Sequence, residues 1–172
     1  MKINLIIFLI LISLSIHAQN ENRILINFIE SADSIILVSH EDLNLKLDIP
    51  GKDEYVKRNL IEDYKINSNL IKEKSILNSE EKGKLIDIIS NQNPDSEDFG
   101  KFCFYPYHAI LLFQVNRWYY IDLSFGCKKY GSSKELKLDK KTFLASKEDW
   151  NVLQEFFLEL NFKYNLPEVK RK

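Results

Sequence analysis

Apolar residues recur at intervals of three and four along three segments of the chain, and this spacing predicts three helices. The first segment covers residues 21–31, the second begins at Asn78 or Ser79, and the third begins after Ser146. Asn and Ser are favoured caps at the start of a helix. The apolar stripes are, in order, Ile24, Leu25, Phe28 and Ile29; Leu85, Ile86, Ile88 and Ile89; and Trp150, Leu153, Phe157 and Leu160, supported by Val152 and Phe156.

Two apolar segments follow the first helix and predict strands. Residues 34–39 hold a short run rich in isoleucine, leucine and valine, and in residues 43–49 apolar and polar positions alternate until Pro50. Strict alternation is typical of a strand that buries one face. The short polar segment between the two runs is interpreted as a hairpin turn, which places His40 in solvent. Among the charged residues that come next, one weaker strand is predicted over residues 65–76.

The most strongly indicated hairpin lies in the second half of the chain. Residues 102–113 and 118–125 are dense in aromatic and aliphatic side chains, and Asn116, which tolerates a left-handed turn, lies between them. Aromatic residues on strands usually take part in core and cross-strand packing, and a binding face is the alternative. The aromatic set comprises Phe102, Phe104, Tyr105, Tyr107, Trp118, Tyr119 and Tyr120.

The order of the predicted elements defines the fold class. Helix, strands, helix, hairpin and helix follow one another, and this order favours an α+β domain with an antiparallel sheet and about three helices packed on one face. A parallel sheet would need repeated crossover helices, which the pattern does not contain. Residues 128–141 are interpreted as a polar connection with a turn at Gly131, and residues 161–166 as a short last strand.

Residues 1–18 have the features of a secretory signal peptide: a positive residue, an apolar run and a small residue at the end. We predict cleavage before Gln19, which leaves one domain over residues 19–172. The alternative is a membrane anchor, but the apolar run of about 14 residues is shorter than the roughly 20 that span a bilayer. We therefore expect export to the periplasm or the cell exterior, with no membrane span after cleavage.

Composition limits the classes of function. The chain has 172 residues, of which 45% are hydrophobic, and its net charge is -1. Nucleic-acid binding favours a clearly basic domain, so we expect no nucleic-acid partner. The sequence contains no glycine-rich phosphate loop, no His-Glu-x-x-His and no EF-hand loop, and we therefore expect no cofactor and no metal. The partner that remains is an unknown protein or a small ligand.

Chemistry-bearing side chains are concentrated on or beside the predicted hairpin. They are Cys103, Pro106, His108, Asp122, Ser124 and Cys127. If the hairpin turns about Val115 with a three-residue loop, Cys103 lies opposite Cys127 and His108 lies opposite Asp122. Both pairs depend on this register, because a slip of one residue moves every side chain to the other face.

The two cysteines have a structural and a catalytic interpretation. In an exported protein an even pair usually forms a disulfide, and we predict the bond Cys103–Cys127. The alternative is a reactive thiol with His108 as its base.

A similar choice between a catalytic and a structural interpretation applies to His108, Asp122 and Ser124, which would form a triad in the first case. A cross-strand pair that satisfies a half-buried imidazole is the simpler interpretation of His108 and Asp122. The sequence has no Gly-x-Ser-x-Gly elbow around Ser124. We therefore assign no catalytic residue, and these residues and Cys103 remain weak candidates.

The hairpin also resembles a family of small exported bacterial proteins of unknown function. Residues 103–110 read Cys-Phe-Tyr-Pro-Tyr-His-Ala-Ile and residues 120–127 read Tyr-Ile-Asp-Leu-Ser-Phe-Gly-Cys, and the family pattern looks like Cys-x-x-Pro-Arg-His-Ala-Ile followed by Cys-Phe-x-Cys. The resemblance runs from about residue 78 to the end and implies a small exported domain. Tyr107 stands where the family tends to have Arg, and Ser124 stands where it tends to have Cys. If the family uses three Cys and one His as a metal or redox site, this chain lacks one ligand.

Because no catalytic constellation is complete, the first hypothesis is a non-enzymatic binding or interaction module with the His108 hairpin as its distinctive surface. The second is a hydrolase or thiol-dependent enzyme that uses His108 with Cys103 or Ser124. The third is a metal-binding protein that uses His108 and the two cysteines.

Overall fold

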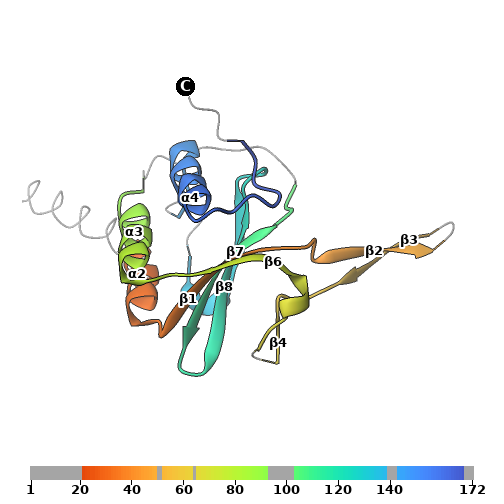
Figure 1. The fold of residues 1–172 in the computed structure, drawn as a ribbon, viewed down its shortest axis with the longest axis horizontal. Helices are drawn as coiled ribbons and strands as arrows, with labels where there is room; N and C mark the ends of the chain where they lie inside the picture. Colours follow the sequence, from red (N-terminus) through yellow and green to blue (C-terminus); the bar gives the residue numbers. More distant parts are fainter. Residues whose placement is uncertain (1–20, 50–51, 64, 93–102, 139–142, 169–172) are drawn as a thin grey trace, which may run out of the picture.

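The computed structural model describes residues 21–49, 52–63, 65–92, 103–138 and 143–168 (Figure 1). The predicted signal peptide 1–18 and the aromatic residue Phe102 lie outside these ranges, so cleavage and the domain boundary at Gln19 stay predictions. Across the described ranges, no helix combines the length and the apolar character needed to cross a membrane.

The helices and strands follow the order expected of an α+β protein. The helices are α2 (Glu21–Ser31), α3 (Ser79–Ser90) and α4 (Lys147–Glu159), with short 3-10 helices η1 (Ser68–Leu70) and η2 (Lys134–Leu136). The strands are β1 (Ser34–His40), β2 (Asn44–Ile49), β3 (Lys52–Lys57), β4 (Ile61–Glu62), β5 (Lys65–Ile66), β6 (Ile71–Ile76), β7 (His108–Gln114), β8 (Arg117–Ser124) and β9 (Lys129–Ser132).

The central feature is a five-stranded antiparallel sheet in the order β6-β1-β7-β8-β9. One face packs against the three helices. Its main core is formed by side chains from both layers, among them Leu25, Ile29, Leu37, Leu85, Ile110, Leu123, Trp150 and Phe157. The predicted α+β class, with an antiparallel sheet and three helices on one face, is therefore confirmed.

The opposite face of the sheet is covered in part by the segment that connects β3 to β6. Leu60 and Leu70 from that segment pack on Val38 and Leu111 in a second, smaller core. Strand β1 is therefore buried on both faces, and β6 and β7 flank it on both edges.

The predicted hairpin of residues 34–39 and 43–49 is wrong. Because both edges of β1 are already paired, β2 pairs instead with β3 in a separate two-stranded ribbon, which projects away from the sheet in Figure 1. His40 is consequently the last residue of a central strand and is fully buried, with 0% of its surface exposed, so its predicted place in solvent is also wrong.

The central hairpin β7–β8 is confirmed, but its predicted register is wrong by one residue. The turn contains two residues, Val115 and Asn116, and both have left-handed backbone angles, with φ of 50° and 58°. Such two-residue turns match the natural twist of a hairpin. His108 therefore lies opposite Leu123, and Asp122 lies opposite Ala109.

Capping explains where two of the helices begin. The side chains of Asn78 and Ser146 each accept a hydrogen bond from the backbone N–H three residues ahead, and the carboxylate three residues ahead accepts one from the N–H of the cap residue. Each such cap is worth about 1 kcal/mol. Two predictions for the connecting segments are wrong: β9 forms where a polar loop was expected, and residues 161–166 form turns because their backbone folds back on α4.

Candidate functional site

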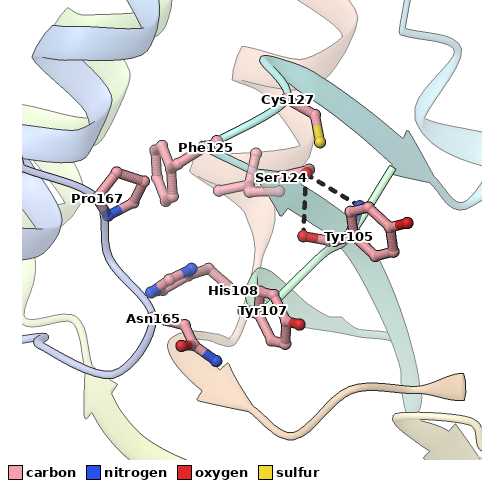
Figure 2. Close-up of a pocket in the computed structure, with 10 residues that line it drawn as sticks. Tyr105, Tyr107, His108, Ser124, Phe125, Cys127, Asn165 and Pro167 are labelled. Atoms are coloured by element: carbon pink, nitrogen blue, oxygen red, sulfur yellow. Dashed lines mark hydrogen bonds between the residues drawn. The ribbon is translucent and has the colours of Figure 1, made fainter. Parts of the chain in front are cut away.

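A pocket of about 330 Å³ lies beside the start of β7 and the end of β8. Figure 2 shows its side chains, which come from the segment before β7, from the two strands, from the turn after β8 and from the C-terminal segment. The lining residues are Tyr105, Tyr107, His108, Leu123, Ser124, Phe125, Gly126, Cys127, Asn165 and Pro167.

His108 is the first residue of β7, and its side chain lies on the helix-covered face of the sheet. Its ring makes edge contacts with Phe125 and Phe157, at centroid distances of 5.1 and 5.5 Å. Figure 2 shows the imidazole directed toward the segment that carries Asn165 and Pro167. Only 1% of the residue is exposed, and its Nε2 atom has no hydrogen-bond partner among the described residues.

Burial determines the charge of this imidazole. The pKa of His108 is lowered from 6.5 to about 4, chiefly because burial disfavours the protonated ring. A positive charge on His40 would lower the pKa further, whereas Glu73 and a backbone hydrogen bond with Tyr164 oppose the shift. His108 is therefore neutral at pH 7 and has one nitrogen that donates and one that accepts.

The carboxylate of Glu73 on β6 anchors the C-terminal side of the pocket. Its Oε2 accepts a hydrogen bond of 2.8 Å from the hydroxyl of Ser39, and its two oxygens accept bonds of 3.0 to 3.1 Å from the backbone N–H groups of Lys163 and Tyr164. Charge-assisted bonds of this kind are stronger than neutral ones. Glu73 thereby fixes the segment that leads directly to Asn165.

The predicted disulfide Cys103–Cys127 is present, with 5.8 Å between the two Cα atoms. Cys127 is buried and lines the pocket, so the bond joins the segment before β7 to the turn after β8 at the pocket wall. A bonded sulfur is not a thiolate, and in this state neither cysteine is a nucleophile.

The hydroxyl of Ser124 is hydrogen-bonded to the backbone of the segment before β7. Its buried hydroxyl accepts a hydrogen bond of 3.1 Å from the N–H of Tyr105 and donates one of 2.9 Å to the carbonyl of the same residue. Both bonds are drawn in Figure 2. Ser124 therefore holds Tyr105 at the rim of the pocket, and no bond between Ser124 and His108 is found among the described residues.

Asp122 lies away from this pocket. Because it is opposite Ala109 in the register, its side chain points to the sheet face that does not carry His108. Burial raises the pKa of Asp122 from 3.8 to about 7, and its Oδ1 atom has no hydrogen-bond partner in the described part of the chain. The structure therefore separates the carboxylate from the imidazole that the predicted register had paired with it.

The described residues offer no ligand set for the metal-binding hypothesis. Within the described ranges, no group of three or more His, Cys, Asp and Glu side chains is arranged to hold a metal ion. The two histidines do influence one another: the His40 ring lies near the His108 backbone, and a positive charge on His40 would lower the pKa of His108. His40 Nδ1 donates to the carbonyl of Glu41 at 2.7 Å, and burial lowers the pKa of His40.

Several residues of the site were not predicted from the sequence. The aromatic set was expected mainly in the core, but Tyr105 is 57% exposed and forms the pocket rim with Tyr107. Asn165 and Pro167 enter through the C-terminal turns. The one sequence signal for them is that Asn tolerates a left-handed backbone, which Asn165 adopts with φ of 50°.

Comparison with protein-family models, with curated proteins and with solved structures finds no match to this chain, so the resemblance of its hairpin to a family of exported proteins stays a prediction.

Proposed function

We propose that this protein is a non-enzymatic binding module whose site is the pocket around His108. One observation carries the proposal: His108 lines a pocket, and the buried Nε2 atom of its imidazole has no partner among the described residues. Buried polar atoms in folded proteins are nearly always hydrogen-bonded, and an exception calls for an external partner such as a ligand. A pocket with apolar walls and a few convergent polar groups is the usual form of a small-ligand site.

The surroundings of His108 favour binding over catalysis. A general base needs a nucleophile within reach, and both nearby candidates are engaged, Ser124 with Tyr105 and Cys127 with Cys103. A pKa near 4 also makes the imidazole a weak base. The hydrolase or thiol-enzyme hypothesis is therefore the less well supported of the two.

Nuclear magnetic resonance screening of a small-fragment library tests the proposal. We expect fragments to shift the amide signals of Tyr107, Ser124 and Phe125, and we expect His108→Phe to weaken those fragments that form a polar contact. Tyr119→Phe is the matched control, because it also removes one polar group from the hairpin and lies against Phe28 instead of the pocket. A library in which no fragment shifts the pocket residues would refute the proposal.

We also infer that the protein functions after export. The disulfide supports this inference, because such bonds persist in oxidising compartments and are rare in the cytosol. The intact mass of the protein isolated from its natural host, with and without reductant and alkylation, reports cleavage before Gln19 and the thiol state together. A full-length mass with two free thiols would contradict export.

A further inference from the structure

Among the described residues that line the pocket around His108, none is Asp, Glu, Lys or Arg. The lining residue with an ordinary pKa near neutrality is His108, and it is uncharged at pH 7. The nearby carboxylate of Glu73 already accepts bonds from Ser39 and from two backbone N–H groups. A charged ligand would lose its hydration without gaining a counter-ion, and this loss is costly in a partly apolar site.

The walls of the pocket are flat and mostly apolar. Phe125 and Pro167 lie on one side of the imidazole and Tyr107 lies on the other, as Figure 2 shows. Leu123 and Cys127 contribute further apolar surface. A volume of about 330 Å³ is at the small end of ligand pockets, which run from roughly 300 to 1,000 Å³. These dimensions suit a molecule built on one ring, which aromatic walls contact through their faces and edges.

Among the described residues that line the pocket, the buried polar atom without a partner is Nε2 of His108. Nε2 of His108 donates or accepts according to the tautomer of the ring. A hydroxyl group satisfies either tautomer, because it both donates and accepts. The hydroxyl of Ser124 cannot supply this partner while it bonds to Tyr105 on both its donor and its acceptor side.

We propose that the pocket binds a neutral, single-ring molecule that carries a hydroxyl group, with the ring between Tyr107 and Phe125 and the hydroxyl on Nε2 of His108. This inference rests on the proposed binding function and adds the chemical class of the ligand. A phenol and a cyclic aliphatic alcohol share this chemistry, and the experiment separates them.

The test is a titration of the full mature chain with five probes, phenol, cyclohexanol, toluene, benzoate and benzylamine, followed through the amide signals of the pocket. We expect phenol or cyclohexanol to bind about tenfold more tightly than toluene, since each supplies a partner to a buried acceptor or donor. Benzoate and benzylamine, which are charged at pH 7, should bind more weakly than either alcohol. Comparing phenol with cyclohexanol identifies whether the ring is aromatic or aliphatic.

His108→Phe tests the role of the nitrogen while keeping a flat ring. In this variant phenol should lose its tenfold advantage over toluene, whereas the Tyr119→Phe control should keep it. If His108→Phe does not fold, a nuclear Overhauser contact between bound phenol and the His108 ring in the wild-type protein replaces that measurement, and its absence overturns the inference.

The outcomes separate the two proposals. If no probe shifts the pocket and the fragment library also fails, the proposed binding function falls together with this inference. If toluene binds as tightly as the two alcohols, or a charged probe binds more tightly, the pocket is still a binding site but the ligand class is wrong.

Discussion

Replacing Asp122 by Asn should stabilise the protein at pH 8 and leave its stability almost unchanged at pH 4. Asn has nearly the shape of a protonated Asp and carries no charge. The pKa of Asp122 is raised from 3.8 to about 7 because the carboxylate is buried and Oδ1 has no partner among the described residues. Asp122→Asn therefore removes a penalty on the free energy of unfolding, and this penalty exists only at pH values at which the carboxylate is ionised in the unfolded chain.

The size and sign of the effect follow from proton linkage. Between pH 3.8 and about 7 the unfolded chain releases a proton that the folded protein retains, so Asp122 lowers the free energy of unfolding as the pH rises. At about 1.4 kcal/mol per pKa unit, the full penalty above pH 7 is at most about 4 kcal/mol. Partial exposure of the residue reduces this upper limit, and we expect Asp122→Asn to gain about 2 kcal/mol at pH 8.

Urea denaturation of both proteins at pH 4, 6 and 8 measures the difference directly. The control is Asp87→Asn, which removes an exposed carboxylate from α3 and makes the same change in net charge. A gain that is equal at pH 4 and pH 8, or a variant that is less stable than wild type at pH 8, would refute the reasoning about burial.

The remaining predictions concern His108, the hairpin turn, the disulfide and the hydrogen bonds that Glu73 accepts from the C-terminal segment. The pKa of His108 is lowered to about 4, so between pH 4 and 6.5 the unfolded chain binds a proton that the folded protein does not. In the Asp122→Asn background, which lacks the opposing pH dependence of Asp122, the free energy of unfolding should therefore rise by more than about 1 kcal/mol from pH 4 to 6.5. Urea titrations measure this rise, and a flat profile would contradict it. Val115→Asn should raise the free energy of unfolding by about 1 kcal/mol, because a β-branched residue is strained at φ of 50° and Asn is not. A loss of stability in urea denaturation would argue against the two-residue turn. Replacing both cysteines by Ser should cost about 3.5 kcal/mol in the chain-entropy treatment of a loop with a separation of 24, and denaturation equal to that of the oxidised wild type would count against the bond. Glu73→Gln should speed hydrogen exchange at the amides of Lys163 and Tyr164, with Glu62→Gln as control, and unchanged exchange would show that the carboxylate does not anchor that segment.

Local patterns in the sequence were sufficient for the elements whose structure depends on near neighbours. The apolar stripes and the caps Asn78 and Ser146 predicted α3 and α4 correctly. Asn116 marked the turn of the central hairpin. The disulfide was also predicted correctly, although the register used for it was wrong, because Cys103 lies before β7 and its position depends on the preceding segment instead of the ladder.

Long-range pairing was the main source of error. The apolar run of β1 does not reveal that β6 and β7 occupy both its edges, so local pattern wrongly favours the chain neighbour β2 as its partner and a solvent position for His40. Similarly, a two-residue turn and a three-residue turn differ by one position, and this difference decides whether Asp122 faces His108. Asn165 lines the pocket because Glu73, on a strand distant in sequence, accepts a hydrogen bond from the preceding residue, Tyr164. No local sequence pattern indicates the contact between Glu73 and Tyr164.

The state of the His108 side chain in solution tests the central claim most directly. Imidazole nitrogen-15 signals, followed by nuclear magnetic resonance from pH 4.5 to pH 8 with and without phenol, report its protonation, its tautomer and the partner of Nε2. We expect a ring that stays neutral above about pH 5 and an Nε2 signal that moves when phenol is added. A ring that titrates near its ordinary pKa of 6.5 and does not respond to phenol would contradict both the burial of this imidazole and its availability to a ligand.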